Sequence, residues 1–175
     1  MKKKVLSIVA VVLVLCCAIG GTLAWLTDRT NPVVNTFTVG DINIELKETT
    51  TNYKMVPGNT ITKDPKVTVK ANSEACWLFV KVEKSSNFDN FMTYEMADGW
   101  TALPGVAGVY YREVAATTTA TEFSVLKDNS VLVKNTVTKA DLNALTQNTF
   151  PTLTFTAYAV QKDNVADAAT AWGKL

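Results

Sequence analysis

Histidine is absent from all 175 residues, and this absence excludes several classes of enzyme at once. Without histidine there can be no Ser-His-Asp triad, no His-assisted cysteine nucleophile and no pair of histidine ligands for zinc. The serines lie in no nucleophile-elbow pattern, and the sequence contains no glycine-rich phosphate loop. We therefore expect a protein that is not an enzyme, with no catalytic residue, no cofactor and no metal ligand.

Cysteine is also scarce. Two of the three cysteines, Cys16 and Cys17, lie in an apolar amino-terminal stretch, which leaves Cys76 alone in the rest of the chain. One thiol cannot form an internal disulfide, so the stability of the fold has to come from packing. Cys76 lies in the strand-like run 75–80, and we expect it to be a small buried hydrophobe rather than a reactive thiol.

The amino-terminal segment has the pattern of a secretory signal peptide. Lysines occupy positions 2–4, an apolar run covers 5–19, and small residues follow. Thr22 and Ala24 have the small side chains that a signal peptidase requires, so we expect cleavage before Trp25. The mature protein would then be secreted, and the chain would meet a membrane only through this segment before cleavage.

Two alternatives exist for the same segment. An uncleaved helix over 5–26 would have about the 20 residues needed to cross a bilayer, and would act as a membrane anchor. A lipoprotein is disfavoured, because Cys16 and Cys17 follow the bulky residues Leu15 and Cys16 where lipid attachment usually requires a small one.

Charge gives no indication of a nucleic-acid partner. The signal segment holds three of the 17 basic residues and no acidic residue, which leaves 14 basic against 16 acidic residues in the mature chain. A net charge near minus two offers no basic surface for a phosphate backbone.

The mature chain is dominated by alternating apolar and polar residues with β-branched and aromatic side chains, which indicates β-strands. The expected strands cover 35–38, 41–48, 61–64, 66–71, 75–83, 92–96, 109–114, 121–126, 131–133 and 152–161. Turns are expected at Pro57-Gly58, Asp98-Gly99 and Pro104-Gly105.

Two short helices interrupt this pattern. Thr138 and Asp141 have the spacing of a capping box, and Val165, Ala168 and Trp172 share one face of a carboxy-terminal helix. We expect Trp172 to anchor that helix on the strands.

The fold class that follows is all-β, a two-sheet antiparallel sandwich of jelly-roll or Greek-key type with one or two short helices. The organisation expected is a cleaved signal peptide at 1–24, an extended amino-terminal segment at 25–38 and one β-sandwich domain at 39–175. The order of the strands does not follow from one sequence.

Several motifs, taken in order, resemble the TasA/camelysin family of Gram-positive bacteria. The opening 21–28 and the run 35–42 resemble the family's "T-x-A, aromatic, T-D … N-x-F-x-x-G" start, and 56–67 resembles its "P-G-x-x-x-x-K" entry to a strand. The run 76–82 is similar to its "V-R-V-K-V" strand, and the ending 156–172 is similar to its "A-Y-A-x-Q … A-W" close. Together these pieces cover most of the mature chain.

The resemblance implies a jelly-roll domain at the cell surface or in the extracellular matrix, whose signal peptide is cut by a SipW-type peptidase. It also implies assembly into biofilm matrix fibres by donor-strand exchange with other copies of the chain, with further matrix proteins as possible partners. The candidate donor segment 25–38 carries five apolar residues: Trp25, Leu26, Val33, Val34 and Phe37. The same segment folding back onto its own domain is the alternative, and the two arrangements do not exclude one another.

Two other functions are alternatives. Camelysin-like relatives are described as surface metalloproteases, but the lack of histidine disfavours a hydrolytic zinc site here. A monomeric surface binding module would use Trp100, Tyr110 and Tyr111, which a hairpin around 103–105 would bring together. Such cross-strand aromatic residues are more often structural.

Overall fold

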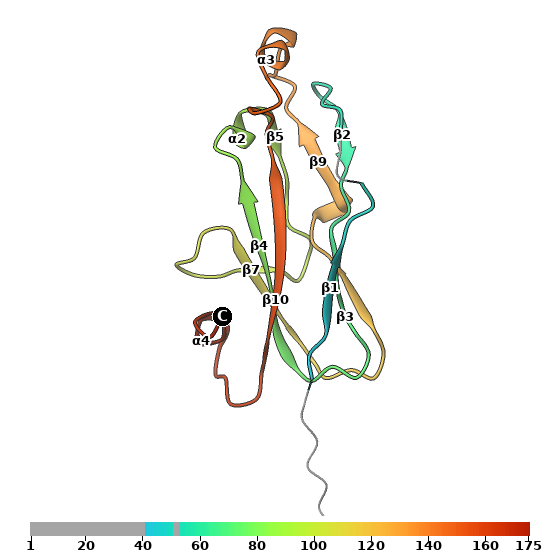
Figure 1. Cartoon of the computed structure of the whole chain (residues 1–175), viewed down its shortest axis with the longest axis vertical. Helices are drawn as coiled ribbons and strands as arrows, with labels where there is room; N and C mark the ends of the chain where they lie inside the picture. Colours follow the sequence, from blue (N-terminus) through green and yellow to red (C-terminus); the bar gives the residue numbers. More distant parts are fainter. Residues whose placement is uncertain (1–40, 51–52) are drawn as a thin grey trace, which may run out of the picture. The chain divides into compact units, whose positions relative to one another are not determined.

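The computed structural model describes residues 41–50 and 53–175, which belong to a compact unit from Val39 to Leu175. The predicted signal peptide, its cleavage residues Thr22, Ala24 and Trp25, and the predicted strand 35–38 lie outside the described residues. Within the described part the protein is a β-sandwich with a few short helices, as predicted (Figure 1).

The strands of the described residues form three antiparallel sheets, whereas two were predicted. The four-stranded sheet contains, in spatial order, β10 (Leu153–Gln161), β4 (Cys76–Lys84), β7 (Val109–Val114) and β6 (Thr101–Ala102). The β1-β3-β8 sheet contains β1 (Ile44–Lys47), β3 (Lys66–Val69) and β8 (Thr121–Ser124). The β2-β9-β5 sheet contains β2 (Thr60–Thr62), β9 (Ser130–Val133) and β5 (Met92–Thr93).

The main core lies between the four-stranded sheet and the β1-β3-β8 sheet. Alternate residues of β4 point inward because side chains on a strand alternate between its two faces. Cys76, Leu78 and Val80 on β4 are fully buried in one cluster with Val67 and Val69 on β3. The sequence prediction that Cys76 packs as a buried hydrophobe is confirmed.

The other face of the four-stranded sheet is covered by the carboxy-terminal helix α4 (Ala168–Trp172). The Trp172 ring lies 5.3 Å from that of Phe79 and 5.4 Å from that of Tyr158, measured between ring centroids. Because β4 is covered on both sides, its residues from Cys76 to Val80 form a continuous buried run rather than an alternating one. The prediction that Trp172 anchors this helix is confirmed.

The β2-β9-β5 sheet lies at the end of the domain where α3 (Lys139–Asn143) is found (Figure 1). The predicted capping box is present: the backbone N–H of Asp141 donates to the Thr138 hydroxyl, and that of Thr138 donates to the Asp141 carboxylate. A second small core fills this end, with Phe88 and Phe91 from the short helix α2 (Phe88–Phe91) packed on Val131 and Val133.

Differences from the predicted elements are local. Helix α2 and the 3₁₀ turn η1 (Lys127–Asn129) were not predicted, and β6 was expected only as part of a hairpin. The predicted strand 92–96 is shorter, since pairing with β9 ends at Thr93. Gly58, Gly99 and Gly105 all have positive φ, as their predicted turns require.

Candidate functional site: an apolar groove beside an edge strand

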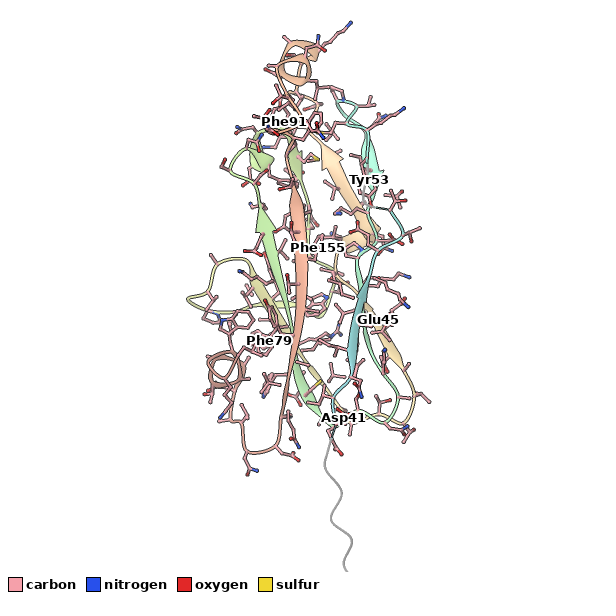
Figure 2. The ribbon with its side chains drawn as sticks, in the orientation of Figure 1. Asp41, Glu45, Tyr53, Phe79, Phe91 and Phe155 are labelled. Carbon is pink, nitrogen blue, oxygen red and sulfur yellow. The ribbon has the colours of Figure 1, made fainter. Side chains whose placement is uncertain are left out.

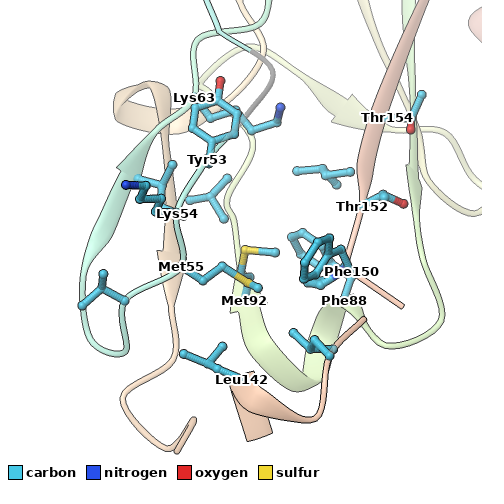
Figure 3. Close-up of a pocket in the computed structure, with 16 residues that line it drawn as sticks. Tyr53, Lys54, Met55, Lys63, Phe88, Met92, Leu142, Phe150, Thr152 and Thr154 are labelled. Carbon is cyan, nitrogen blue, oxygen red and sulfur yellow. The ribbon is translucent and has the colours of Figure 1, made fainter. Parts of the chain in front are cut away.

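A groove of about 790 Å³ opens between the start of β10 and the segment that leads into β2. Its lining is mainly apolar, and Lys54 and Lys63 are its charged members. The residues that line it are Tyr53, Lys54, Met55, Val56, Ile61, Lys63, Phe88, Met92, Val131, Leu142, Leu145, Phe150, Pro151, Thr152, Leu153 and Thr154. Met55 and Met92 meet near the middle of the groove, with Phe88 and Phe150 on the side of β10 (Figure 3).

Large apolar side chains are exposed at the rim of this groove. Among the described residues, four large hydrophobic side chains are exposed: Val56, Leu132, Phe150 and Leu175. Two of them line the groove, Val56 at 48% and Phe150 at 51% exposure. Exposed apolar area gathered around a cavity is typical of a surface that another chain covers.

One wall of the groove is the edge of a sheet. Within the described part of the chain, β4 is the one strand that pairs with β10, so the second edge of β10 carries unpaired N–H and C=O groups. The segment that faces β10 across the groove also has an unpaired backbone. Among the described residues, none forms a backbone hydrogen bond with Tyr53, Lys54 or Met55. An unpaired edge of this kind is a template for an added strand.

A buried ion pair fixes the inner wall. The Lys63 ammonium lies 2.6 Å from a Glu48 carboxylate oxygen, and the two side chains are 11% and 17% exposed. The same ammonium lies 5.0 Å from the centre of the Tyr53 ring and 5.4 Å from that of Phe155. Lys63 therefore joins the segment around Tyr53 to β10 across the inner part of the groove.

Hydrogen bonds hold Tyr53 and Thr49 in place. The Tyr53 hydroxyl donates to Glu48 at 2.8 Å, and both the N–H and the hydroxyl of Thr49 donate to the Asp64 carboxylate. Burial, and then the nearby Glu48 carboxylate, raise the pKa of Tyr53. The hydrogen bonds from Thr49 lower the pKa of Asp64. These contacts keep the wall of the groove in place while leaving its backbone unpaired.

The groove and the start of the described chain lie at opposite ends of the domain. Asp41 accepts a backbone hydrogen bond from Glu74, next to the Cys76 end of β4, whereas Leu153 pairs with Lys84 at the other end of that strand. Figure 2 shows Asp41 at one end of the domain, with Tyr53 and Phe91 toward the other. The segment before Asp41 therefore joins the domain far from its groove.

The structure places only part of the predicted functional set. The candidate donor residues Trp25, Leu26, Val33, Val34 and Phe37 all lie outside the described residues. The groove itself was not predicted. Its members come from five separate parts of the chain, and the only sequence signals were the apolar residues Leu142, Leu145 and Phe150 beside the predicted helix.

The three aromatic residues considered for a binding module do not share one exposed patch. Trp100 is half-buried, and its indole N–H donates to the Ser124 carbonyl at 2.8 Å. The rings of Trp77 and Tyr111 lie 6.0 Å apart, edge to face, on the face that α4 covers. Tyr110 packs in the main core on the opposite face. The predicted hairpin is present, with Thr101 opposite Tyr111.

The described residues do not fit a catalytic metal. Among them, no three His, Cys, Asp or Glu side chains come close enough together to hold an ion. The chain has no histidine, and burial raises the pKa of the Cys76 thiol to about 11, which disfavours the thiolate that a metal needs. In the same part of the chain, no helix combines the length and apolar character required to span a membrane.

The fold and the groove thus define an all-β sandwich domain with an open sheet edge. A family model described as camelysin metallo-endopeptidase matches residues 1–84, which end at the last residue of β4. This match over the first 84 residues supports, at family level, the TasA/camelysin resemblance that the motifs predicted. Searches of curated proteins and of solved structures returned no match.

Proposed function

We propose that this chain is a secreted structural protein that assembles into fibres of an extracellular or biofilm matrix by head-to-tail strand donation. The segment 25–38 of one copy is the donor, and the groove beside β10 of the next copy is the acceptor. A peptidase of the SipW type releases the donor by cutting before Trp25. The partner is thus another copy of the same chain.

The observation that carries this proposal is the unpaired edge of β10 beside an apolar groove. Main-chain hydrogen bonds to such an edge give affinity, and alternate side chains in the groove give register. The groove residues 150–154, of which Leu153 and Thr154 belong to β10, would span about 13 Å if extended, enough for a short added strand. The donor segment offers apolar side chains to fill the groove.

The donor segment and the acceptor groove belong to opposite ends of the domain, which favours a polymer. The donor segment joins the domain at the Asp41 end, and the acceptor groove lies at the Leu153 end. A contact between two different surfaces is heterologous, and it propagates as a filament when it does not close into a ring. Repetition of this contact gives a fibre in which each groove is filled by the next copy.

Deletion of the donor tests this function. A chain starting at Trp25 should form filaments in negative-stain electron microscopy, whereas one lacking 25–34 should remain as separate particles. Because the deletion leaves the described domain intact, its circular dichroism spectrum should match that of the full mature chain. Filaments of unchanged number and length from the truncated chain would refute strand donation.

A peptidase is the second candidate, and the description of the matching family favours it. Casein cleavage by the purified chain, measured with and without a chelator, separates the two functions. We expect no turnover under either condition, because the chain has no histidine and the described residues gather no three side chains that could hold a hydrolytic metal. Cleavage that a chelator abolishes would establish the peptidase instead.

A further inference from the structure

The side chain of Arg112 enters the space between the four-stranded sheet and the β1-β3-β8 sheet. Arg112 lies on β7 opposite Leu78 of β4, and residues directly opposite one another in an antiparallel pair share a face. Leu78 is fully buried in the main core, so Arg112 leaves β7 on the core side. There it meets Phe123 of β8, and it is half-buried in this position.

Two aromatic rings hold the guanidinium group of Arg112. Its central carbon lies 4.0 Å from the centre of the Phe123 ring and 5.4 Å from that of the Trp100 ring. A cation is attracted to an aromatic face at both distances. The Trp100 ring is itself fixed, because its indole N–H donates to the Ser124 carbonyl at 2.8 Å. The guanidinium is thus held in one orientation by the fold alone.

The end of the side chain reaches the surface at the turn before β6. Gly99 in this turn is exposed, and a Cβ added to it would lie 2.8 Å from Nη2 and 3.5 Å from Nη1 of Arg112. The guanidinium therefore occupies the space that a side chain at position 99 would need, next to solvent. The positive φ of Gly99, 85°, also favours glycine there, so the approach to the guanidinium stays open.

The described residues supply no anion for this cation. Arg112 forms no ion pair among them, and its Nε is buried without a hydrogen-bond partner. Glu113 and Glu122, its acidic neighbours on β7 and β8, pair with lysines instead. Burial lowers the pKa of Arg112, but a guanidinium stays charged in proteins. A buried polar nitrogen without a partner costs free energy, so the site gains from an anion supplied from outside.

We infer that Arg112, Trp100 and Phe123 form a binding site for a carboxylate, the group that small organic acids and acidic sugars share. A guanidinium presents its N–H groups in a fixed fork that matches the two oxygens of a carboxylate. One carboxylate neutralises the single positive charge of the site. A phosphate would bring a second negative charge close to the exposed Asp98, which precedes Gly99. The site therefore prefers a carboxylate to a phosphate.

This site is separate from the acceptor groove. β6 and β10 form the two edges of the four-stranded sheet, and the groove lies beside β10. Arg112 lies on β7, next to β6, and Trp100 directly precedes β6. Carboxylate binding is thus a second function of the domain, and it does not depend on strand donation.

Isothermal titration calorimetry with glucuronate as the probe tests the site. The purified chain should bind glucuronate, and R112M should weaken the binding by about tenfold or more. R112K should weaken it as well, because an ammonium keeps the charge but lacks the fork. Inorganic phosphate should bind more weakly than glucuronate, and glucose should not bind.

Acetate distinguishes the two sources of the carboxylate. Acetate that binds as tightly as glucuronate would assign the site to small organic acids. Weaker binding of acetate would assign it to acidic sugars, because the sugar ring would then add contacts of its own. Both results support a carboxylate site.

The matched control is K127M. Lys127 is an exposed cation that pairs with Glu95 at 2.7 Å, so its removal should leave the affinity for glucuronate unchanged. R112M should fold, because methionine replaces a charge that has no anionic partner among the described residues. Glucuronate should raise the urea midpoint of the unmodified chain and of K127M, and leave that of R112M unchanged.

Three results would overturn the inference. Equal affinity of R112M and the unmodified chain for glucuronate would remove Arg112 from the site. Phosphate that binds more tightly than glucuronate would refute the preference for a carboxylate. A urea midpoint that glucuronate does not raise in the unmodified chain, together with a lower midpoint for R112M, would make Arg112 a structural residue. None of these results bears on strand donation, so the proposed function is tested separately.

Discussion

The ammonium of Lys63 lies 2.6 Å from the Glu48 carboxylate, on the inner wall of a groove that is otherwise mainly apolar. Lys63 is 9% exposed and is one of two buried polar residues among those described, with Ser73. A buried charge without a partner destabilises a fold, so each member of this pair offsets the cost of burying the other. The pair thus stabilises the wall of the acceptor groove.

Removal of one partner should therefore cost more than removal of both. We expect K63M and E48Q each to lower the free energy of unfolding by about 2 kcal/mol, below the usual range for a fully buried pair because both groups retain some exposure. The double variant should lose much less than the sum of the two. Urea unfolding of the four proteins measures this coupling, and strictly additive losses would show that the pair contributes nothing.

The rim of the groove should control assembly without controlling folding. Replacing the exposed Val56 or Phe150 with Asp places a charge where the donor strand is expected to pack, so filaments should be lost. The free energy of unfolding of the monomer should change by less than about 0.5 kcal/mol, because both side chains are already exposed. Filament density by negative-stain microscopy is the measurement.

Leu132 supplies the control for these variants. It is 44% exposed on β9 and does not line the groove. L132D should form filaments like the unmodified chain. If L132D abolished assembly as completely as F150D, the effect would come from added surface charge rather than from the groove.

The strands were predictable from the sequence where one pattern dominates. The run 109–114 was placed correctly, since β-branched and aromatic residues there form a ladder with β4. The division into three sheets was not predictable, because it depends on which strand edges form hydrogen bonds with one another. Pairing between strands that are distant along the chain leaves no pattern in the local sequence. The sequence of β4 also does not show which of its side chains face the main core. Because α4 buries the face that would otherwise be polar, apolar and polar residues do not alternate along this strand.

The candidate donor could be named from the sequence, but the acceptor could not. Lys63 falls in the predicted strand 61–64, and no local pattern there marks this lysine as buried. Its burial follows from the approach of Glu48, Tyr53 and Phe155, which lie up to 92 positions away along the chain. Long-range packing of this kind leaves no spacing that a single sequence can show.

Gly108 should tolerate a side chain less well than Gly105. Both have positive φ, +74° and +77°, so alanine at either position is strained by about 1 kcal/mol. At Gly108 a Cβ would also lie 2.5 Å from the Val82 carbonyl oxygen, whereas at Gly105 nothing lies within 4 Å. We expect G108A to lose about 1–2 kcal/mol more than G105A in urea unfolding. Equal losses would show that the hairpin shifts freely away from β4.

Acid should destabilise the domain through carboxylates whose folded pKa is lowered. Hydrogen bonds from Thr138 lower the pKa of Asp141, and those from Thr170 lower the pKa of Asp167, at the starts of α3 and α4. A lowered folded pKa contributes stability that is present above the unfolded pKa of about 3.9 and is lost as pH falls through the folded value. The free energy of unfolding should therefore decline below about pH 4.

The two caps can be tested separately from the other acidic groups. D141N and D167N should each flatten the decline between neutral pH and pH 3, as followed by urea titration at several pH values. K174M leaves both caps unchanged and serves as a control on an exposed carboxy-terminal charge. A decline of the same steepness in D141N, D167N and the unmodified chain would contradict the assignment.

The most direct measurement of the central claim is negative-stain microscopy of two purified chains side by side. One begins at Trp25, and the other carries an extra block of residues before Trp25 that hinders insertion of the new terminus. The account predicts filaments from the free terminus alone. Separate particles of uniform size from both chains would contradict it, and would favour a monomeric surface protein whose groove binds another partner.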